Sequence, residues 1–93
     1  MADSSRFLTI LCHLVRETEK AIQLHWDDED NDVNMQIWVP KKCIEEDDFD
    51  REVTLQKLRS AARTNFILVD VAVWWIQDQE WFDESIQELI DLD

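Results

Sequence analysis

The sequence predicts an α+β fold in which a small antiparallel sheet packs against one or two helices, including an amphipathic C-terminal helix. The sheet would combine a hairpin over residues 20–39 with one or two further strands. Three patterns lead to this prediction: two runs that alternate apolar and polar residues, a later β-branched run, and a helical apolar stripe near the C-terminus. The 93 residues fit a single domain, 1–93. Because 45% of them are hydrophobic and five are Trp, the chain can form a core despite its high net charge.

The N-terminal part of the chain predicts three strands. Arg6–Glu17 is rich in Leu, Ile and Val and indicates a buried strand, although its periodicity alone leaves a helix open. Lys20–Trp26 and Val33–Val39 alternate, which predicts an antiparallel hairpin joined by a long acidic loop at 27–32. Pro40 ends the second run, since proline cannot donate a hydrogen bond to a β-ladder.

The middle of the chain predicts one helix. A short turn at Lys41–Ile44 and an acidic loop at Glu45–Glu52 precede Thr54–Arg63, which contains good helix formers and has Thr54 as a plausible N-cap. The apolar residues at helical spacing in this segment are Leu55, Leu58 and Ala62.

The C-terminal part predicts a strand over Phe66–Val73 and helix over Trp74–Leu92, with a break near 83–85. The helical stripe consists of Trp75, Phe82, Ile86, Leu89 and Ile90. The chain contains no Gly, so turns that need a positive φ must use Asn or Asp. The candidates are Asp30, Asn31, Asp32 and Asn65.

Charge is the strongest functional signal. The chain has 22 Asp and Glu against 9 Lys and Arg, a net charge of −13, and no basic residue follows Arg63. Such a protein repels nucleic acid and membrane phosphates, so we expect neither as a direct partner, and it attracts basic protein surfaces. The predicted partner-binding acids are Asp27, Asp28, Glu29, Asp30 and Asp32, then Glu45, Glu46, Asp47 and Asp48, and finally Asp78, Glu80, Asp83 and Glu84.

The tryptophans divide between core and surface. Trp26, Trp74 and Trp75 lie in apolar runs, and we expect them in the core. Trp38 points away from the apolar face of its strand, so either the sheet is covered on both faces or Trp38 is an exposed anchor. Trp81 stands among carboxylates and is the favoured interface residue, because Arg and Lys side chains stack on Trp.

The acidic residues do not match a calcium loop. Asp28, Asp30 and Asp32 have the spacing of the first three EF-hand ligands. However, Val33 occupies the position of the required Gly and Val39 that of the bidentate Glu, so we expect no specific calcium site.

The sequence gives little support for zinc binding or for catalysis. Cys12, His13, His25 and Cys43 lack zinc-finger spacing, and the adjacent Cys12 and His13 would point to opposite faces of a strand. We find no phosphate-binding loop, nucleophile elbow or paired-His motif, and therefore predict a non-enzyme without cofactor or metal. No secretory signal is visible, and the most apolar run, Phe66–Ile76, is too short to span a bilayer, so we expect a cytoplasmic protein with reduced thiols.

Two short motifs carry a resemblance. Glu17-Thr18-Glu19-Lys20-Ala21-Ile22, followed by Ile37-Trp38-Val39-Pro40-Lys41-Lys42-Cys43-Ile44, resembles a pattern in small uncharacterised bacterial and phage proteins. The likeness covers about a third of the chain, departs from the pattern at Lys42-Cys43 and in the longer stretch 45–65, and implies a hairpin-plus-helix module without any chemistry.

In size and charge, rather than in motif, the chain also resembles acidic phage inhibitors, which include anti-CRISPR proteins and DNA-mimic antirestriction proteins. This resemblance implies an inhibitor that blocks the DNA or RNA groove of a CRISPR effector or other defence nuclease in the host bacterial cytoplasm. The alternative is a structural or adaptor protein that forms a small homo-oligomer and uses its acids for solubility. A homodimer is left open, and a small hydrolase or enzyme accessory ranks last.

Overall fold

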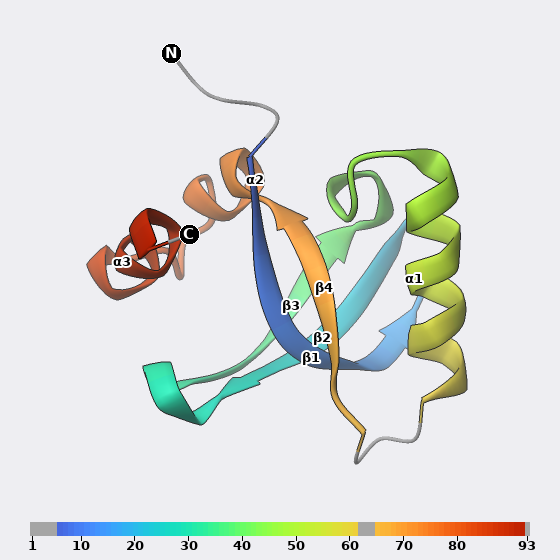
Figure 1. Ribbon diagram of the computed structural model, residues 1–93, viewed down its shortest axis with the longest axis horizontal. Coiled ribbons are helices and arrows are strands. Elements are labelled where there is room, and N and C mark those ends of the chain that lie inside the picture. Colours follow the sequence, from blue (N-terminus) through green and yellow to red (C-terminus); the bar gives the residue numbers. More distant parts are fainter. Residues whose placement is uncertain (1–5, 62–64, 93) are drawn as a thin grey trace.

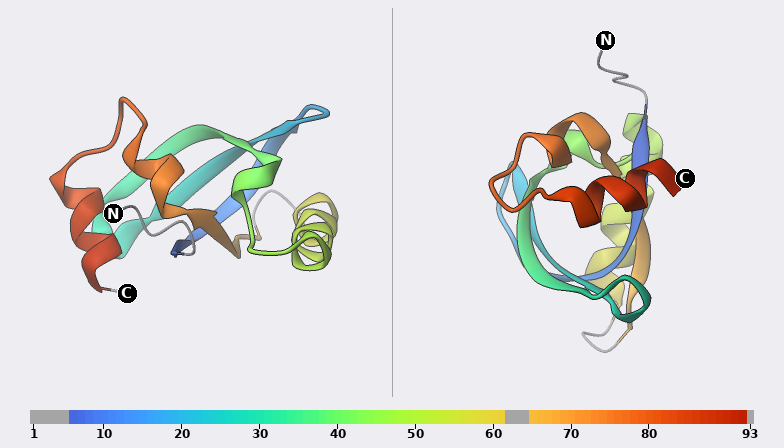
Figure 2. Two further views of the ribbon diagram at one scale, coloured as in Figure 1. Left: turned by 90° about the horizontal axis from the view of Figure 1, so that it is seen from above. Right: turned by 90° about the vertical axis from the view of Figure 1, so that its left-hand side faces the viewer.

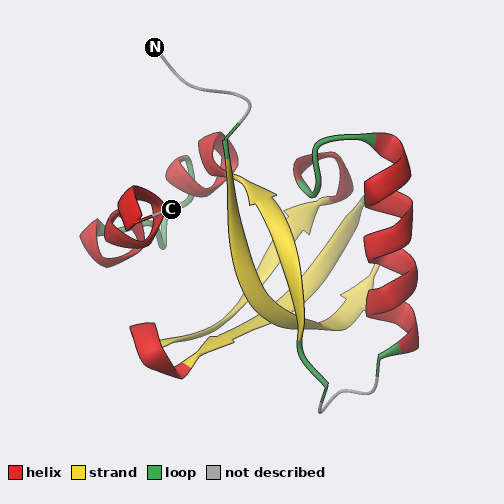
Figure 3. Cartoon of the chain, viewed as in Figure 1, coloured by secondary structure: helices red, strands yellow, loops and turns green. Residues whose placement is uncertain are grey.

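The computed structural model describes residues 6–61 and 65–92 and has the predicted α+β fold (Figure 1, Figure 3). Its antiparallel sheet has the strand order β3-β2-β1-β4. The strands are β1 (Phe7–Glu17), β2 (Ala21–Asp28), β3 (Val33–Pro40) and β4 (Ile67–Ala72). The α-helices are α1 (Asp48–Ser60), α2 (Val73–Gln77) and α3 (Glu84–Leu92), and short 3-10 turns follow β2 (η1, Glu29–Asn31) and β3 (η2, Lys41–Cys43).

The β2–β3 hairpin is longer than the sequence predicted. Its register runs from Ala21 opposite Pro40 to Asp28 opposite Val33, so Asp27 and Asp28 belong to β2 and the connection is confined to 29–32. The expected long acidic loop over 27–32 is therefore wrong in its bounds. Asp28 caps η1 at its N-terminus. Asp32 follows η1 and has a φ of 56°, the left-handed conformation that we expected for one of these Asp and Asn residues.

One face of the sheet forms the core. The buried strand residues are Leu8, Ile10 and Cys12 of β1, Ile22, Leu24 and Trp26 of β2, Val33, Ile37 and Val39 of β3, and Val69, Val71 and Ala72 of β4. Apart from Ala72 at the end of β4, these positions follow the period-two alternation, which confirms the predicted apolar face of the hairpin. No helix of the described residues covers the opposite face, because these helices lie at two ends of the curled sheet (Figure 1, Figure 2).

Strand β1 bends strongly along its length (Figure 1). Its register against β2 shifts between Leu14 and Arg16, an irregularity of the kind that increases local twist and bending. Beyond the shift, Glu17 pairs with Ile22, a core position. The end of β1 is thereby brought next to helix α1.

Helix α1 begins earlier than the sequence predicted. The expected acidic loop over Glu45–Glu52 is wrong in its second half, and Asp47 rather than Thr54 is the N-cap, since Asp47 Oδ1 accepts a hydrogen bond from Asp50 N at 2.7 Å. Thr54 is buried within the helix beside Leu55 and Leu58. The other predicted helix residues, Ala62 and Arg63, lie outside the described residues.

The C-terminal segment forms two helices, and its break is longer and starts earlier than expected. Helix α2 ends at Gln77, and α3 starts at Glu84. Asp83 caps α3, because its Oδ1 accepts a hydrogen bond from Ile86 N at 3.1 Å. Trp26 and Trp75 are buried as predicted, whereas the prediction that Trp74 is a core residue is wrong, because the short helix leaves its ring 43% exposed. Arg6 Nη2 donates to the Ile90 carbonyl at 3.0 Å and fastens α3 to the start of β1.

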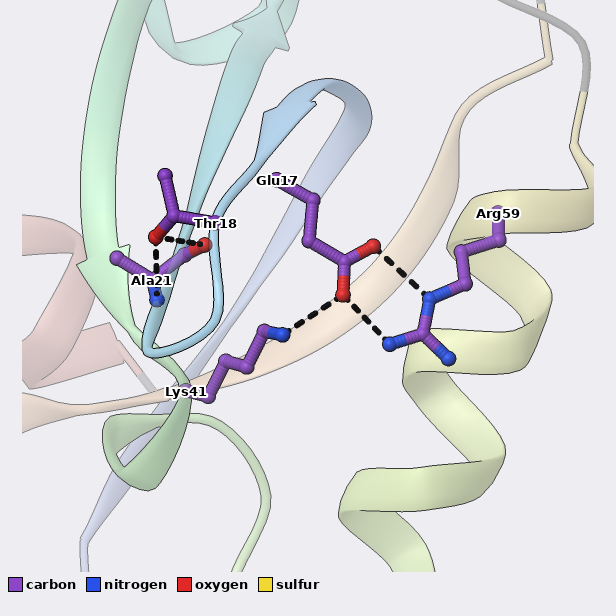
Figure 4. A network of polar contacts seen from close by, with 5 residues as sticks. All are labelled: Glu17, Thr18, Ala21, Lys41 and Arg59. Atoms are coloured by element: carbon purple, nitrogen blue, oxygen red, sulfur yellow. Dashed lines mark hydrogen bonds and ion pairs between the residues drawn. The ribbon is translucent and has the colours of Figure 1, made fainter.

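A polar network fastens α1 to the opposite end of the sheet (Figure 4). The carboxylate of Glu17 accepts hydrogen bonds from Arg59 Nε at 2.9 Å and Arg59 Nη2 at 2.5 Å, and it lies 2.7 Å from Lys41 Nζ. The hydrogen bonds from Arg59 and Lys41 lower the pKa of Glu17 from 4.5 to about 2. One side chain of β1 thus binds both α1 and η2.

We predict that Glu17→Gln lowers the free energy of unfolding at neutral pH by about 1 kcal/mol, the upper range for a partly exposed ion pair. Because the folded-state pKa of Glu17 lies below its ordinary value, its contribution is complete above pH 4.5 and is lost as the pH falls towards 2. Urea unfolding of both proteins at neutral pH and near pH 2 measures this. Glu19→Gln, on the adjacent turn, is the control, and a Glu17→Gln deficit that stays constant with pH would contradict the prediction.

Candidate functional site

Two acidic segments without Lys or Arg lie at one end of the molecule, and most of the described basic residues lie at the other. The tip of the β2–β3 hairpin and helix α3 lie at the same end, and α1 lies at the other (Figure 1, Figure 2). A shallow hollow between the tip and α3 is lined by Asp32, Met35, Trp81 and Asp83, among others, which places the two acidic segments side by side. We call residues 27–32 and 78–92 the acidic end; neither segment contains a Lys or Arg.

Most carboxylates of the hairpin tip take no part in hydrogen bonds or ion pairs among the described residues. Asp28 is used within the tip, since its carboxylate accepts from Asn31 N at 3.3 Å and from Asn31 Nδ2 at 2.8 Å. Within the described part of the chain, Asp27, Glu29 and Asp30 have no side-chain hydrogen bond or ion pair to another residue. Their carboxylates are therefore available to an external cation.

The C-terminal acids of the acidic end are also mostly exposed. Asp78, Glu80, Glu84 and Glu88 are solvent-exposed, while Asp83 caps α3. The last turn of α3 contains no basic residue of its own, and Arg6 donates to its Ile90 carbonyl from the start of β1.

The second acidic block, Glu45–Asp50, lies apart from the acidic end. Glu45 has a φ of 57° and pairs with β4, since Glu45 N donates to the Asp70 carbonyl at 2.8 Å and the Glu45 carboxylate accepts from Asp70 N at 2.7 Å. Burial raises the pKa of Glu45. Asp47 caps α1, and Asp48 forms an ion pair with Arg51 at 2.5 Å. Of the predicted partner-binding residues, Glu45, Asp47 and Asp48 therefore have roles in the fold, and Glu46 is exposed beside them.

Most of the described basic residues lie at the α1 end, near this second block: Arg16, Lys20, Lys41, Lys42, Arg51, Lys57 and Arg59. These seven come from the end of β1, the β1–β2 turn, η2 and α1. Arg6 is the exception, since its Nη2 donates to the Ile90 carbonyl of α3. The structure thus joins the first acidic block to the C-terminal acids and leaves the second block among cations.

The open face of the sheet adds an apolar surface that the sequence analysis missed. Leu11 of β1 and Leu68 of β4 are cross-strand partners on this face and are 39% and 66% exposed. Next to them, the ring of Phe66 contacts His13 and His25, with ring centroids 4.8 Å and 6.0 Å apart. Leu68 could have been found by strand parity, because it alternates with Val69 and Val71.

A hollow joins this apolar face to the hairpin tip. Its volume is about 320 Å³, and its lining consists of Leu11, Phe66, Asp27, Asp28, Glu29 and Asp30. An apolar floor and an acidic wall therefore meet at one place on the surface.

The two surface tryptophans of the sequence analysis differ in their surroundings. Trp38 is 44% exposed on the open face, which agrees with the exposed alternative. Trp81 is only half-exposed, because its ring packs edge-on against Trp26 and Trp75, with centroids 6.4 Å and 5.9 Å apart. Its role as a partner-binding anchor stays a prediction.

The cysteines have surroundings that disfavour the thiolate. Cys12 is buried in the core, whereas the adjacent His13 lies on the open face. Burial raises the pKa of Cys12 to about 12 and also raises that of Cys43. Within residues 6–61 and 65–92, no three His, Cys, Asp or Glu residues are placed to hold a metal ion together.

Within the same residues, none of the helices has the length and apolar character required to cross a bilayer. No protein-family model matches the chain, and neither a curated protein nor a solved structure matches it. Function must therefore be inferred from the placement of charge and apolar surface.

We predict opposite effects on stability for acids of the two blocks. Asp47→Ala removes a helix cap and should lower the free energy of unfolding by about 1 kcal/mol. Asp30→Asn removes only charge repulsion and should leave stability unchanged or raise it by a few tenths of a kcal/mol at low salt. Urea unfolding at low and high salt measures both. A loss for Asp30→Asn as large as that for Asp47→Ala would show that the hairpin carboxylates support the fold.

Proposed function

We propose that this protein is a non-enzymatic inhibitor that presents its acidic end to the basic groove of a nucleic-acid-handling protein, in place of DNA or RNA. The target class is a CRISPR effector or another defence nuclease of a bacterial cytoplasm. The observation that carries the proposal is the segregation of charge: residues 27–32 and 78–92 contain many carboxylates and no Lys or Arg.

The chemistry of the acidic end suits this role. Duplex DNA presents one negative charge per about 1.7 Å of its axis, and proteins bind it through Lys and Arg. Carboxylates on a hairpin tip and on a helix beside it can meet the same cations that phosphates would meet.

The placement of the acids argues against solubility as their only purpose. A protein that needs only solubility gains from acids at any exposed position. Here the acids of residues 27–32 and 78–92 lie side by side with no Lys or Arg in either segment, so they repel one another. Concentration of one sign of charge supports long-range attraction of an oppositely charged partner.

A homo-oligomeric structural or adaptor protein is the second candidate, and the observation that favours it is the open face of the sheet. Leu11, Trp38 and Leu68 are exposed there. Apolar association of this kind would persist or strengthen in high salt, whereas binding through the acidic end would weaken. Sedimentation of the protein alone at low and high salt separates the two.

We predict that Asp27, Glu29 and Asp30, changed together to Lys, abolish inhibition of the target while the fold is retained. Asp28 and Asp32 are left in place, because Asp28 caps η1 and Asp32 has a left-handed backbone that disfavours Lys. The measurement is capture from a nuclease-treated bacterial lysate at low salt, elution by rising salt, and mass spectrometry, followed by a cleavage assay on the captured protein.

The matched control changes Glu19, Glu46 and Glu52 to Lys, which alters the net charge equally but at exposed positions away from the acidic end. We expect it to retain capture and inhibition, and excess duplex DNA to compete with the wild-type protein. Equal loss in both triple variants, or capture that is insensitive to salt and to DNA, would count against the proposal.

A further inference from the structure

We propose that the open face of the sheet beside the hairpin tip is a docking site for an arginine side chain of the basic partner. The site is the hollow between Leu11 and Phe66 on one side and Asp27–Asp30 on the other. The inference rests on the proposed function, since it names the chemistry by which the same partner would be held.

The apolar part of the site is a sheet face that the fold leaves uncovered. Leu11 and Leu68 face each other across β1 and β4 and remain exposed, while the helices occupy the ends of the sheet (Figure 2). In a strongly acidic protein, adjacent exposed apolar side chains of this kind point to an interaction surface. Phe66 is held in place by its ring contacts with His13 and His25, so its exposed part is ordered before binding.

Charge complementarity decides which partner fits. Asp27, Glu29 and Asp30 stand at the edge of the apolar floor without a cation among the described residues. A neutral apolar partner would cover these carboxylates without pairing them, which is costly. A second copy docked here through the same face would bring two sets of acids together. The aliphatic stem of a cationic side chain can cover the apolar residues of the hollow, and its charged head can pair with the carboxylates.

The lining of the hollow favours arginine over lysine. Its volume of about 320 Å³ leaves room for one long side chain between Phe66 and the carboxylates. A guanidinium group is planar, stacks on an aromatic ring such as Phe66 and pairs with carboxylates through two parallel hydrogen bonds. A lysine ammonium group is more strongly hydrated and lacks this fork.

The experiment uses two dye-labelled peptides of equal length, one rich in arginine and one rich in lysine, and measures their affinities by fluorescence anisotropy. We expect the wild-type protein to bind the arginine peptide more tightly. Leu11→Thr retains the net charge and strand propensity and should weaken arginine-peptide binding roughly tenfold, and Phe66→Leu should remove most of the preference for arginine. Phe49→Ser, at an exposed apolar position of α1, is the matched control and should change neither affinity.

Amide chemical shifts of the labelled protein locate the peptide. Shifts centred on residues 11, 27–30 and 66 support the site, whereas shifts spread evenly over all acidic segments overturn it. Concentration-dependent shifts at Leu11 and Leu68 without peptide would assign the face to a second copy and also overturn it. Circular dichroism of each variant checks its fold, and Leu68→Thr, at a more exposed position of the same face, replaces Leu11→Thr if that variant unfolds.

The outcome separates this inference from the proposed function. If Leu11→Thr and Phe66→Leu bind the arginine peptide like wild type while the triple Lys variant of the hairpin tip does not, the docking site is wrong and the inhibitor proposal stands. If the apolar variants weaken binding as expected but capture from lysate is independent of the hairpin charges, the docking site stands and the inhibitor proposal fails.

Discussion

The burial of a single face of a curled sheet is the constraint on which the rest of the structure depends. Alternating strands place residues such as Trp26 and Val71 inside, and the bend of β1 wraps the sheet around them. The curled sheet leaves its core open at two ends, which α1 closes with Leu55 and Leu58 and α3 closes with Ile86 and Ile90. Because the described helices close these two ends, they do not cover the outer face of the sheet, which remains exposed to solvent.

The carboxylates have different roles at the two ends of the molecule. At the α1 end, carboxylates are used by the fold: Glu17 binds Arg59 and Lys41, and Glu45 satisfies the backbone of an edge strand at Asp70. The pairing of Glu45 with β4 also protects part of an exposed sheet edge. At the acidic end, Asp27, Glu29 and Asp30 have no such roles within the described residues. Repulsion among these acids opposes folding.

The alternating runs at Lys20–Trp26 and Val33–Val39 predicted the hairpin strands and their buried face, because this pattern depends on neighbouring residues alone. Asp32 was one of four candidates for a positive φ, which followed from the absence of Gly. The start of α1 was missed because Asp47, Asp48 and Asp50 were interpreted as loop; an acidic N-cap followed by acids in the first turn is also the signature of a helix start. The left-handed Glu45 could not be predicted, since its conformation is imposed by hydrogen bonds to Asp70, far away in the sequence. The hollow likewise arises only when the end of β2 and the residue before β4 meet across β1.

Acidic and apolar residues line the same hollow, so two contributions to binding can be distinguished there, one from charge and one from apolar contact. In the complex we propose, ion pairs at the acidic end would act at long range, speed the encounter and lose strength as salt screens them. Contact with Leu11 and Phe66 would act only at short range and persist in salt. A partner held by charge alone would be exchanged readily for any basic surface, whereas one that also fills the hollow must offer a side chain with both a cationic head and an apolar stem. In the proposed function, selectivity among basic proteins would therefore depend on the open sheet face, and the rate of encounter would depend on the hairpin tip and α3.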